Sequence, residues 1–256
     1  MSSESRIEWT ERTWNPTTGC TKVSAGCTHC YAEVMARRLH AMGARGYERR
    51  FELALHEDRL AQPLLRHAPT VYFVNSMSDL FHARVPRDFV HQVFQVMVDT
   101  PQHTYQILTK RSRRLRILAP GLVWPPNVWM GVSVEDAARM YRVDDLRLVP
   151  AAVRFLSCEP LLGTLAGIDL TGIGWVIAGG ESGPGHRKAD TAWITGLRDE
   201  CTAAGVPFFF KQWGGRTPKA GGRELDGRTW DGLPARRNPE SQSDTADIPS
   251  PEQPRA

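Results

Sequence analysis

The sequence predicts an α/β protein that forms a partial or complete parallel (β/α) barrel of about six or seven strands. Two features predict this class: short apolar runs recur along the chain, and helical patterns lie between them. The length agrees, because 256 residues, 41% of them apolar, suffice for one sizeable core. Single α/β barrel domains of roughly 200–250 residues are common.

Six apolar runs predict the strands. Each is short, rich in β-branched or aromatic side chains and without strict polar alternation, which is typical of a strand buried on both faces. The runs are Thr70–Asn75, Thr104–Thr109, Asn127–Val132, Val153–Ser157, Gly174–Ala178 and Val206–Phe210. We expect one earlier strand within Ile7–Trp14.

Helical patterns separate these runs. Pro86–Val98 has a proline in its first turn and apolar residues close to helical period, and Glu135–Leu148 is a second such segment. A third, Asp190–Ala204, has Asp190 as its expected N-cap and ends at Gly205. Strands that alternate with helices predict right-handed βαβ units and a parallel sheet. A doubly wound open sheet is the alternative.

Composition bounds the rest. The net charge of +4 permits an acidic partner such as nucleic acid without requiring one. No apolar run reaches the roughly 18 residues of a membrane span, and the N-terminus lacks a signal core, so we expect a cytoplasmic protein with no membrane partner. We expect residues 1–215 to form the β/α domain, residues 216–239 a C-terminal extension, and residues 240–256 a disordered tail.

Three of the five cysteines, Cys20, Cys27 and Cys30, form a C-x6-C-x2-C cluster. An odd cysteine count without an export signal argues against a disulfide framework and favours metal or redox chemistry. Glycines directly precede Cys20 and Cys27 and allow a tight loop, and a helix is expected to start just after Cys30.

Three thiolates fit an iron–sulfur cluster with one open iron, because a structural zinc ion needs four ligands and an ordinary four-iron cluster needs four cysteines. A zinc site completed by His29, Cys158 or another histidine is one alternative. A thiol switch and three buried, inert cysteines are the others.

The Cys-x-x-Cys-Tyr ending of this loop, before a helix and after the first strand, resembles the cluster loop of radical SAM enzymes, whose usual spacing is C-x3-C-x2-C. The resemblance implies a radical SAM-like barrel in which Cys20, Cys27 and Cys30 hold a [4Fe-4S] cluster. That cluster would cleave S-adenosylmethionine to a 5′-deoxyadenosyl radical. It also implies an external electron donor such as flavodoxin or ferredoxin.

The chain also resembles an uncharacterised family named after phage gene products thirty-seven and sixty-eight. The resemblance covers roughly residues 7–215 and implies no substrate. The strings that carry it are TTGCTKVSAGCTHCYAE, VNSMSDLFH, QILTKR, VWMGVSVE, RFLSCEPLLG, WVIAGGESG and PFFFKQWG.

Polar residues follow the predicted strands at the end where β/α barrels bind ligands. With Tyr31, these are the expected cofactor-binding residues: Asn75, Ser76, Asp79, Lys110, Ser133, Glu135, Glu159, Gly179, Gly180, Glu181 and Lys211. The Thr109-Lys110 pair also resembles the strand-three lysine of spore-photoproduct-lyase-like radical SAM enzymes.

S-adenosylmethionine makes matching demands on these residues. Lys110 can neutralise its carboxylate, and Asp79, Ser76 or Asn75 can accept from its ammonium. Ser133 and Glu135 suit the ribose hydroxyls.

Two further roles are expected at the strand ends. Gly179 and Gly180 would let the backbone approach the adenine. Cys158 is a candidate hydrogen-atom donor, with a buried packing role as its alternative.

Two arginine-rich stretches could flank the same site and suit a nucleic acid substrate, with Trp213 or Tyr47 as a stacking face. They contain Arg37, Arg38, Arg45, Arg49, Arg50, Arg59 and Arg66, then Arg111, Arg113, Arg114 and Arg116. Solvated helix faces paired with nearby acids are the alternative. A zinc-stabilised nucleic-acid-binding module without catalysis is the second functional hypothesis.

Overall fold

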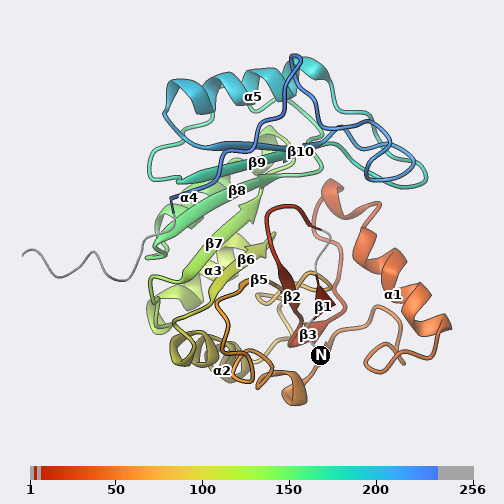
Figure 1. The fold of residues 1–256 in the computed structure, drawn as a ribbon, viewed down its shortest axis with the longest axis vertical. Helices are drawn as coiled ribbons and strands as arrows, with labels where there is room; N and C mark the ends of the chain where they lie inside the picture. Colours follow the sequence, from red (N-terminus) through yellow and green to blue (C-terminus); the bar gives the residue numbers. More distant parts are fainter. Residues whose placement is uncertain (1–2, 5–6, 236–256) are drawn as a thin grey trace, which may run out of the picture.

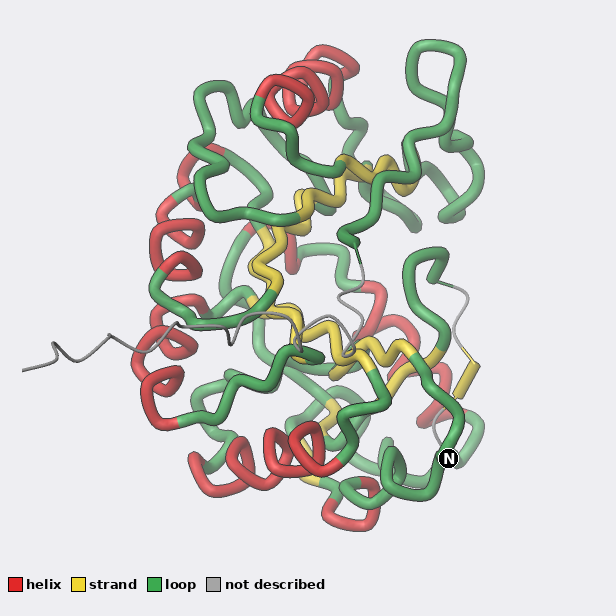
Figure 2. Tube along the Cα trace, turned by 60° about the vertical axis from the view of Figure 1, so that its left-hand side comes forward, coloured by secondary structure: helices red, strands yellow, loops and turns green. Residues whose placement is uncertain are grey.

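The computed structural model describes residues 3–4 and 7–235. Within these residues seven strands run parallel in one curved sheet, whose strands are labelled in Figure 1 and which Figure 2 shows as a curved row. In spatial order they are β2 (Arg12–Trp14), β5 (Val71–Val74), β6 (Thr104–Thr109), β7 (Val128–Ser133), β8 (Val153–Cys158), β9 (Trp175–Gly179) and β10 (Phe208–Gln212). The short β1 (Ser3–Glu4) pairs antiparallel with β2.

The predicted fold class is confirmed in its partial form. Each of the predicted runs overlaps a strand, and the strand order follows the chain order without reversal. A doubly wound sheet would require a reversal, so that alternative is wrong. Among the described residues β2 and β10 do not pair with each other, and the sheet is therefore a half-barrel rather than a closed barrel.

Helices cover the outer face of the sheet. They are α2 (Arg87–Asp99), α3 (Ser112–Leu118), α4 (Tyr141–Arg147) and α5 (Thr191–Ala203), while α1 (Tyr31–Ala41) follows the cysteine loop. The Asp190 carboxylate accepts a hydrogen bond from the Ala192 N–H at 2.9 Å, as its predicted capping role requires.

One predicted helix differs from the structure. Glu135–Leu148 is split into the 3₁₀ turn η4 (Ala137–Arg139) and α4, because Glu135 is held in its own contacts at the end of β7. Short elements complete the chain: η1 (Ala25–Cys27), η2 (Glu57–Arg59), η3 (Ala119–Gly121) and the two-stranded sheet of β3 (Thr17–Thr18) and β4 (Ala54–Leu55).

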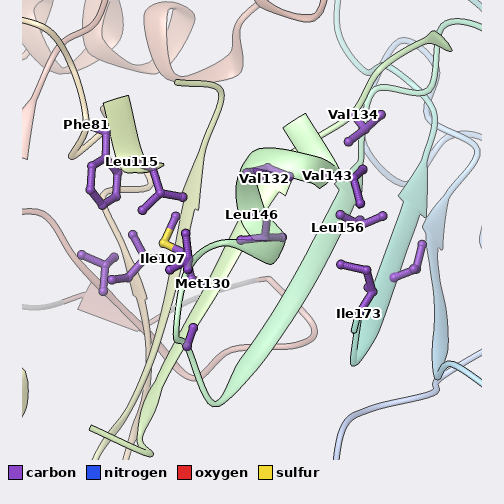
Figure 3. Close-up of a cluster of buried hydrophobic side chains, with 14 of the residues drawn as sticks. Phe81, Ile107, Leu115, Met130, Val132, Val134, Val143, Leu146, Leu156 and Ile173 are labelled. Carbon is purple, nitrogen blue, oxygen red and sulfur yellow. The ribbon is translucent and has the colours of Figure 1, made fainter. Parts of the chain in front are cut away.

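The main core lies between the sheet and the outer helices. Figure 3 shows Val132 and Leu156 of the strands beside Val143 and Leu146 of α4, all of them buried. Burial of each such side chain stabilises the fold by roughly 1.5–3 kcal/mol. This core fixes the outward positions of every strand.

A second, aromatic cluster fills the inner, concave face of the half-barrel. Trp9, Phe73, Trp129, Phe155 and Trp175 belong to it, and the Trp9 ring meets the Phe73 and Trp175 rings edge-on at 4.9 and 5.8 Å. Successive strand residues point to opposite faces. Every second residue after these aromatic residues therefore lies on the same inner face, closer to the carboxyl end of its strand.

The segment after β10 packs back onto the domain. Leu225 is buried, Trp230 packs against the main core, and Asp231 bridges Phe209 at the outer edge of β10. The predicted tail, residues 240–256, lies outside the described residues, and so do residues 236–239 of the predicted extension. None of the described helices is long and apolar enough to cross a bilayer.

Candidate active site at the carboxyl edge of the sheet

The inner face changes from aromatic to polar along each strand. Counting in twos from the aromatic cluster, Phe73 leads to Asn75, Trp175 to Gly179 and Glu181, and Phe209 to Lys211. The same count places Lys110, which follows Gln106, on the inner face. It also places Ser133 and Glu135 there, after Trp129, and Glu159, after Phe155. The predicted strand-end residues are thus gathered at one edge.

Asp79 organises the end of β6. Its Oδ1 accepts from the Thr109 hydroxyl at 2.7 Å, and its Oδ2 accepts from the Lys110 backbone N–H at 3.1 Å. The Asp79 carboxylate is also 3.7 Å from Arg111 Nε. Asp79 therefore positions Lys110 and Arg111, and its contact with a ligand ammonium stays a prediction.

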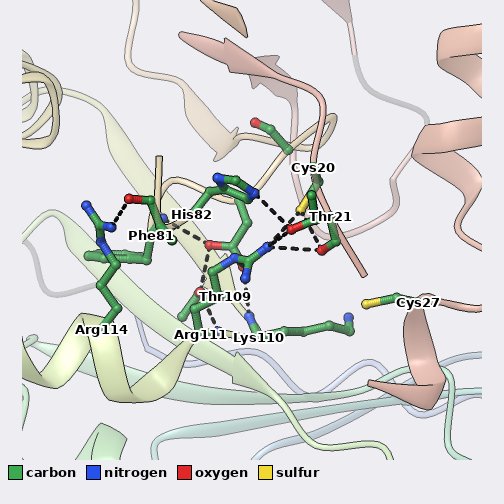
Figure 4. A network of polar contacts seen from close by, with 12 residues as sticks. Cys20, Thr21, Cys27, Phe81, His82, Thr109, Lys110, Arg111 and Arg114 are labelled. Atoms are coloured by element: carbon green, nitrogen blue, oxygen red, sulfur yellow. Dashed lines mark hydrogen bonds and ion pairs between the residues drawn. The ribbon is translucent and has the colours of Figure 1, made fainter. Parts of the chain in front are cut away.

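Lys110 is held by a neutral partner. Its Nζ donates to Ser133 Oγ at 3.0 Å, and the side chain extends toward Cys27 in Figure 4. No carboxylate forms an ion pair with Lys110 in the described part of the chain. Its ammonium charge is therefore available to an anionic ligand.

Glu159 and Lys211 pair with each other. Lys211 Nζ lies 2.7 and 2.9 Å from the two Glu159 oxygens, and Gln212 Nε2 links Glu159 Oε1 to Ser182 Oγ at 3.3 and 2.9 Å. These contacts tie the ends of β8, β9 and β10 together. Lys211 has its own counterion and differs in this from Lys110.

Gly180 is required by a neighbouring strand. A Cβ atom at Gly180 would lie 2.0 Å from the Trp213 carbonyl oxygen, and its N–H donates to the Gln212 carbonyl at 2.9 Å. At Gly179 a Cβ would lie 3.4 Å from the Glu159 side chain. The close backbone approach predicted here is therefore to β10, and it accounts for Gly180 without adenine.

Asn75, Ser76 and Tyr31 link the end of β5 to the start of α1. The Tyr31 hydroxyl donates to the Ser76 carbonyl, and the Ser76 hydroxyl donates to Asn15 Oδ1 at 3.2 Å. Asn75 has a left-handed backbone with φ of 60° and is buried, and its Nδ2 has no acceptor among the described residues. A buried amide donor without a partner is costly and fits a site that a ligand completes.

The cysteine loop crosses this edge with three free, partly exposed thiols, Cys20, Cys27 and Cys30. Arg111 Nη2 lies 3.6 Å from Cys20 Sγ and 3.0 Å from the Thr21 carbonyl oxygen (Figure 4). Burial and then Asp79 raise the pKa of the Cys20 thiol, against a lowering by Arg111. α1 begins at the residue after Cys30, as predicted.

Buried Glu135 anchors the first half of the loop. Ser24 donates to one Glu135 oxygen, while Arg142 Nη1 donates to the other at 2.8 Å. Gly26 packs against the Glu135 side chain, because a Cβ atom at Gly26 would be 2.5 Å from Glu135 Cγ. Both oxygens of Glu135 are therefore engaged within the protein, and the contact to ribose hydroxyls expected from the sequence stays a prediction.

Glu181 anchors the second half. His29 Nδ1, between Cys27 and Cys30, lies 2.9 Å from Glu181 Oε2, and Arg187 bonds both Glu181 oxygens while its Nη2 donates to the Ala25 carbonyl at 2.9 Å. Burial raises the pKa of Glu181, but the hydrogen bonds from Arg187 and His29 outweigh it and lower the pKa to about 2. This carboxylate is therefore charged at neutral pH.

Sequence reasoning missed Ser24, Arg142 and Arg187, and it considered His29 only as a zinc ligand. Cys158, expected as a hydrogen-atom donor, is fully buried in the outer core beside Leu156. Because Cys158 lies on the helix-facing side of β8, its position gives no support to a catalytic role. Tyr47, expected as a stacking face, is also buried.

In the described residues the three thiols do not form a site for a single metal ion. Among the described residues, no three His, Cys, Asp or Glu side chains converge on a position for a single metal ion. Three partly exposed thiols, a lysine without a carboxylate and an amide without an acceptor do fit a larger group. A [4Fe-4S] cluster with an amino-acid-bearing cofactor is such a group.

Fold and site together define an α/β half-barrel with a three-cysteine loop pinned over the carboxyl ends of its strands. The chain belongs to a family described as "Protein of unknown function (DUF5131)", whose model matches residues 4–234. That description names neither an activity nor a phage, so the phage resemblance stays a prediction. The chain has no match among curated proteins.

Solved structures of spore photoproduct lyase show a remote similarity. The complex with dinucleoside spore photoproduct has a TM-score of 0.47 and 14% identity, covering 70% of this chain. A double mutant of that enzyme with bound AdoMet and dinucleoside spore photoproduct gives the same values. This chain spans 58% of the length of both solved chains. A similarity this remote assigns no reaction to this chain.

Proposed function

We propose that this protein is a radical SAM-type enzyme whose Cys20, Cys27 and Cys30 hold a [4Fe-4S] cluster with one open iron. A single observation carries the proposal. Three free cysteines lie on one loop that two buried carboxylates, Glu135 and Glu181, pin to the strand ends beside Lys110. Three thiolate ligands leave one iron for a cofactor.

The chain's own residues would bind and orient S-adenosylmethionine. Lys110, held at 3.0 Å from Ser133 Oγ and without a carboxylate partner among the described residues, would neutralise the cofactor's carboxylate. The unpartnered Asn75 amide would donate a hydrogen bond at the same edge. The aromatic cluster below closes the inner face and excludes water from it.

The bound cofactors would supply one-electron chemistry, the reductive cleavage of S-adenosylmethionine that starts radical reactions. An external donor such as flavodoxin or ferredoxin would deliver the electron. The protein's contribution is to fix the loop, to hold the cofactor's charged end and to position a substrate.

Anaerobic reconstitution with iron and sulfide tests the proposal. We expect about four irons per chain, and we expect Cys20→Ala, Cys27→Ala and Cys30→Ala each to abolish cluster binding. Cys201→Ala is the matched control, because Cys201 is buried in α5 away from the loop and its loss should leave the iron content unchanged.

Turnover provides a second readout. Reduced, reconstituted protein should convert S-adenosylmethionine to 5′-deoxyadenosine and methionine, and the apoprotein should not. A colourless protein that binds one zinc ion and no iron under these conditions would contradict the proposal and favour the zinc-stabilised binding module.

A further inference from the structure

A small basic pocket adjoins the cysteine loop. It has a volume of about 230 Å³ and is lined by Val23 of the loop, Lys110, Arg111, Arg113, Arg114 and Tyr141. Pockets that enclose a whole drug-sized ligand measure about 300–1,000 Å³. This pocket therefore suits one group of a larger molecule.

Among the described residues, four basic side chains and no carboxylate line the pocket. Asp79, 3.7 Å from Arg111 Nε, is the one carboxylate in the described part of the chain that pairs with any of these four basic residues. Arg114 donates to the Ala83 and Val85 carbonyls, which are neutral. Burial and then the neighbouring Arg111 lower the pKa of Arg114, as expected for positive charge that lacks a counterion.

Arg113 lies over an aromatic ring of the pocket. Its guanidinium lies 5.2 Å from the centre of the Tyr141 ring, and in the described residues it has no carboxylate partner. Tyr141 is 40% exposed. A free guanidinium fork matches phosphate geometry, and an exposed aromatic face beside it accepts a stacked base.

The first arginine-rich stretch differs from the second. Arg45 pairs with Asp58 at 3.4 Å, Arg59 donates to the Asn15 carbonyl at 3.4 Å, and Arg66 donates to the Thr70 hydroxyl at 2.6 Å. These arginines are used for local structure. By contrast, Arg113 of the pocket has no carboxylate partner among the described residues.

We propose that this pocket binds a backbone phosphate of a single-stranded polynucleotide, with Arg113 as the main phosphate contact and Tyr141 as a base-stacking face. The proposal deepens the proposed function, because a phosphate held beside Val23 would anchor the substrate next to the cysteine loop. Binding itself needs no radical chemistry and can be measured separately.

The test is fluorescence anisotropy of labelled single-stranded DNA and RNA with full-length, anaerobically reconstituted protein. We expect Arg113→Ala to weaken binding about tenfold and to reduce the slope of log Kd against log salt by about 0.7. Tyr141→Leu should weaken binding and leave that slope unchanged, because it removes a stacking face and no charge.

Arg116→Ala is the matched control. It removes the same charge from the same helix, but Arg116 points to Asp145, at 3.0 Å, and does not line the pocket. We expect it to change Kd by less than about twofold. Equal effects of the two arginine variants would show that net charge alone matters and would overturn the proposal.

Two further outcomes would overturn it. One is wild-type affinity weaker than about 100 μM at low salt, below ordinary non-specific binding. The other is displacement of the oligonucleotide by adenosine monophosphate at equal phosphate concentration, which would identify a free nucleotide as the ligand. Iron content is measured on every variant, so a lost cluster and a lost phosphate contact are distinguished.

Discussion

His29 and Glu181 lie 152 residues apart in the chain, and their side chains meet at 2.9 Å. His29 is part of the cysteine loop, and Glu181 follows β9. The contact makes the shape of the loop depend on the far end of the sheet. It also gives the loop a charged anchor that can be tested by pH.

The first prediction concerns this anchor. Glu181 has a pKa lowered from 4.5 to about 2 in the folded protein, so its contribution to stability is present above about pH 4.5 and is lost as pH falls toward 2. We expect wild type to have a higher Tm than Glu181→Gln at neutral pH. Thermal melts should show this difference shrink as pH falls from about 4.5 toward 2. A pH-independent difference would contradict the prediction.

The second concerns the buried pair of Glu135 and Arg142, whose side chains are 0% and 1% exposed. Glu135→Leu should cost about 3–5 kcal/mol in urea unfolding, because it leaves the Arg142 charge buried and unpaired. Adding Arg142→Leu to it should recover part of this loss. As a control, Asp144→Ala breaks the more exposed pair with Arg147 and should cost about 0–1 kcal/mol.

The third concerns Gly26. A methyl group at this position would collide with Glu135 Cγ at 2.5 Å, so Gly26→Ala should loosen the loop and lower iron retention after reconstitution. Limited proteolysis should show faster cleavage near residue 26. Gly196→Ala is the control: Gly196 is in α5 with nothing within 4 Å of a new Cβ, and the change should stabilise the protein by up to about 1 kcal/mol.

The fourth concerns Lys110. Lys110→Ala should weaken S-adenosylmethionine binding by roughly 1.5–3 kcal/mol in calorimetry, because it removes a charge-assisted hydrogen bond. The absorption spectrum of the cluster should not change. Lys211→Ala is the comparison, since Lys211 already pairs with Glu159 at 2.7 Å and its loss should affect stability more than affinity. If Lys110→Ala binds S-adenosylmethionine as tightly as wild type does, Lys110 has a structural role only.

The strands were predictable because each is buried on both faces and therefore appears as a continuous apolar run. Val71–Val74 and Trp175–Gly179 are buried throughout, and no polar alternation obscures them. The helix Ser112–Leu118 was not predicted, since three of its seven residues are arginines, a fourth arginine precedes it, and its buried positions are few.

The positions of the site residues were predictable, whereas their partners were not. Lys110 and Glu181 were found because parallel strands place their carboxyl ends at one edge. That Glu135 and Glu181 anchor the cysteine loop depends on Ser24, His29 and Arg187, which are far from them in sequence or were assigned no such role. Counting every second residue from the aromatic residues would have placed Glu181 on the inner face of the sheet and Cys158 on the outer, helix-facing side.

The two anchors of the cysteine loop also set an order for maturation. Ser24 and His29 meet partners that lie 111 and 152 residues further along the chain. On the ribosome the thiols emerge early, yet the loop acquires its final shape only after β9 and Glu181 have been made. Whatever the thiols hold in the mature protein is therefore fixed in place late, after the sheet that shelters it has been assembled.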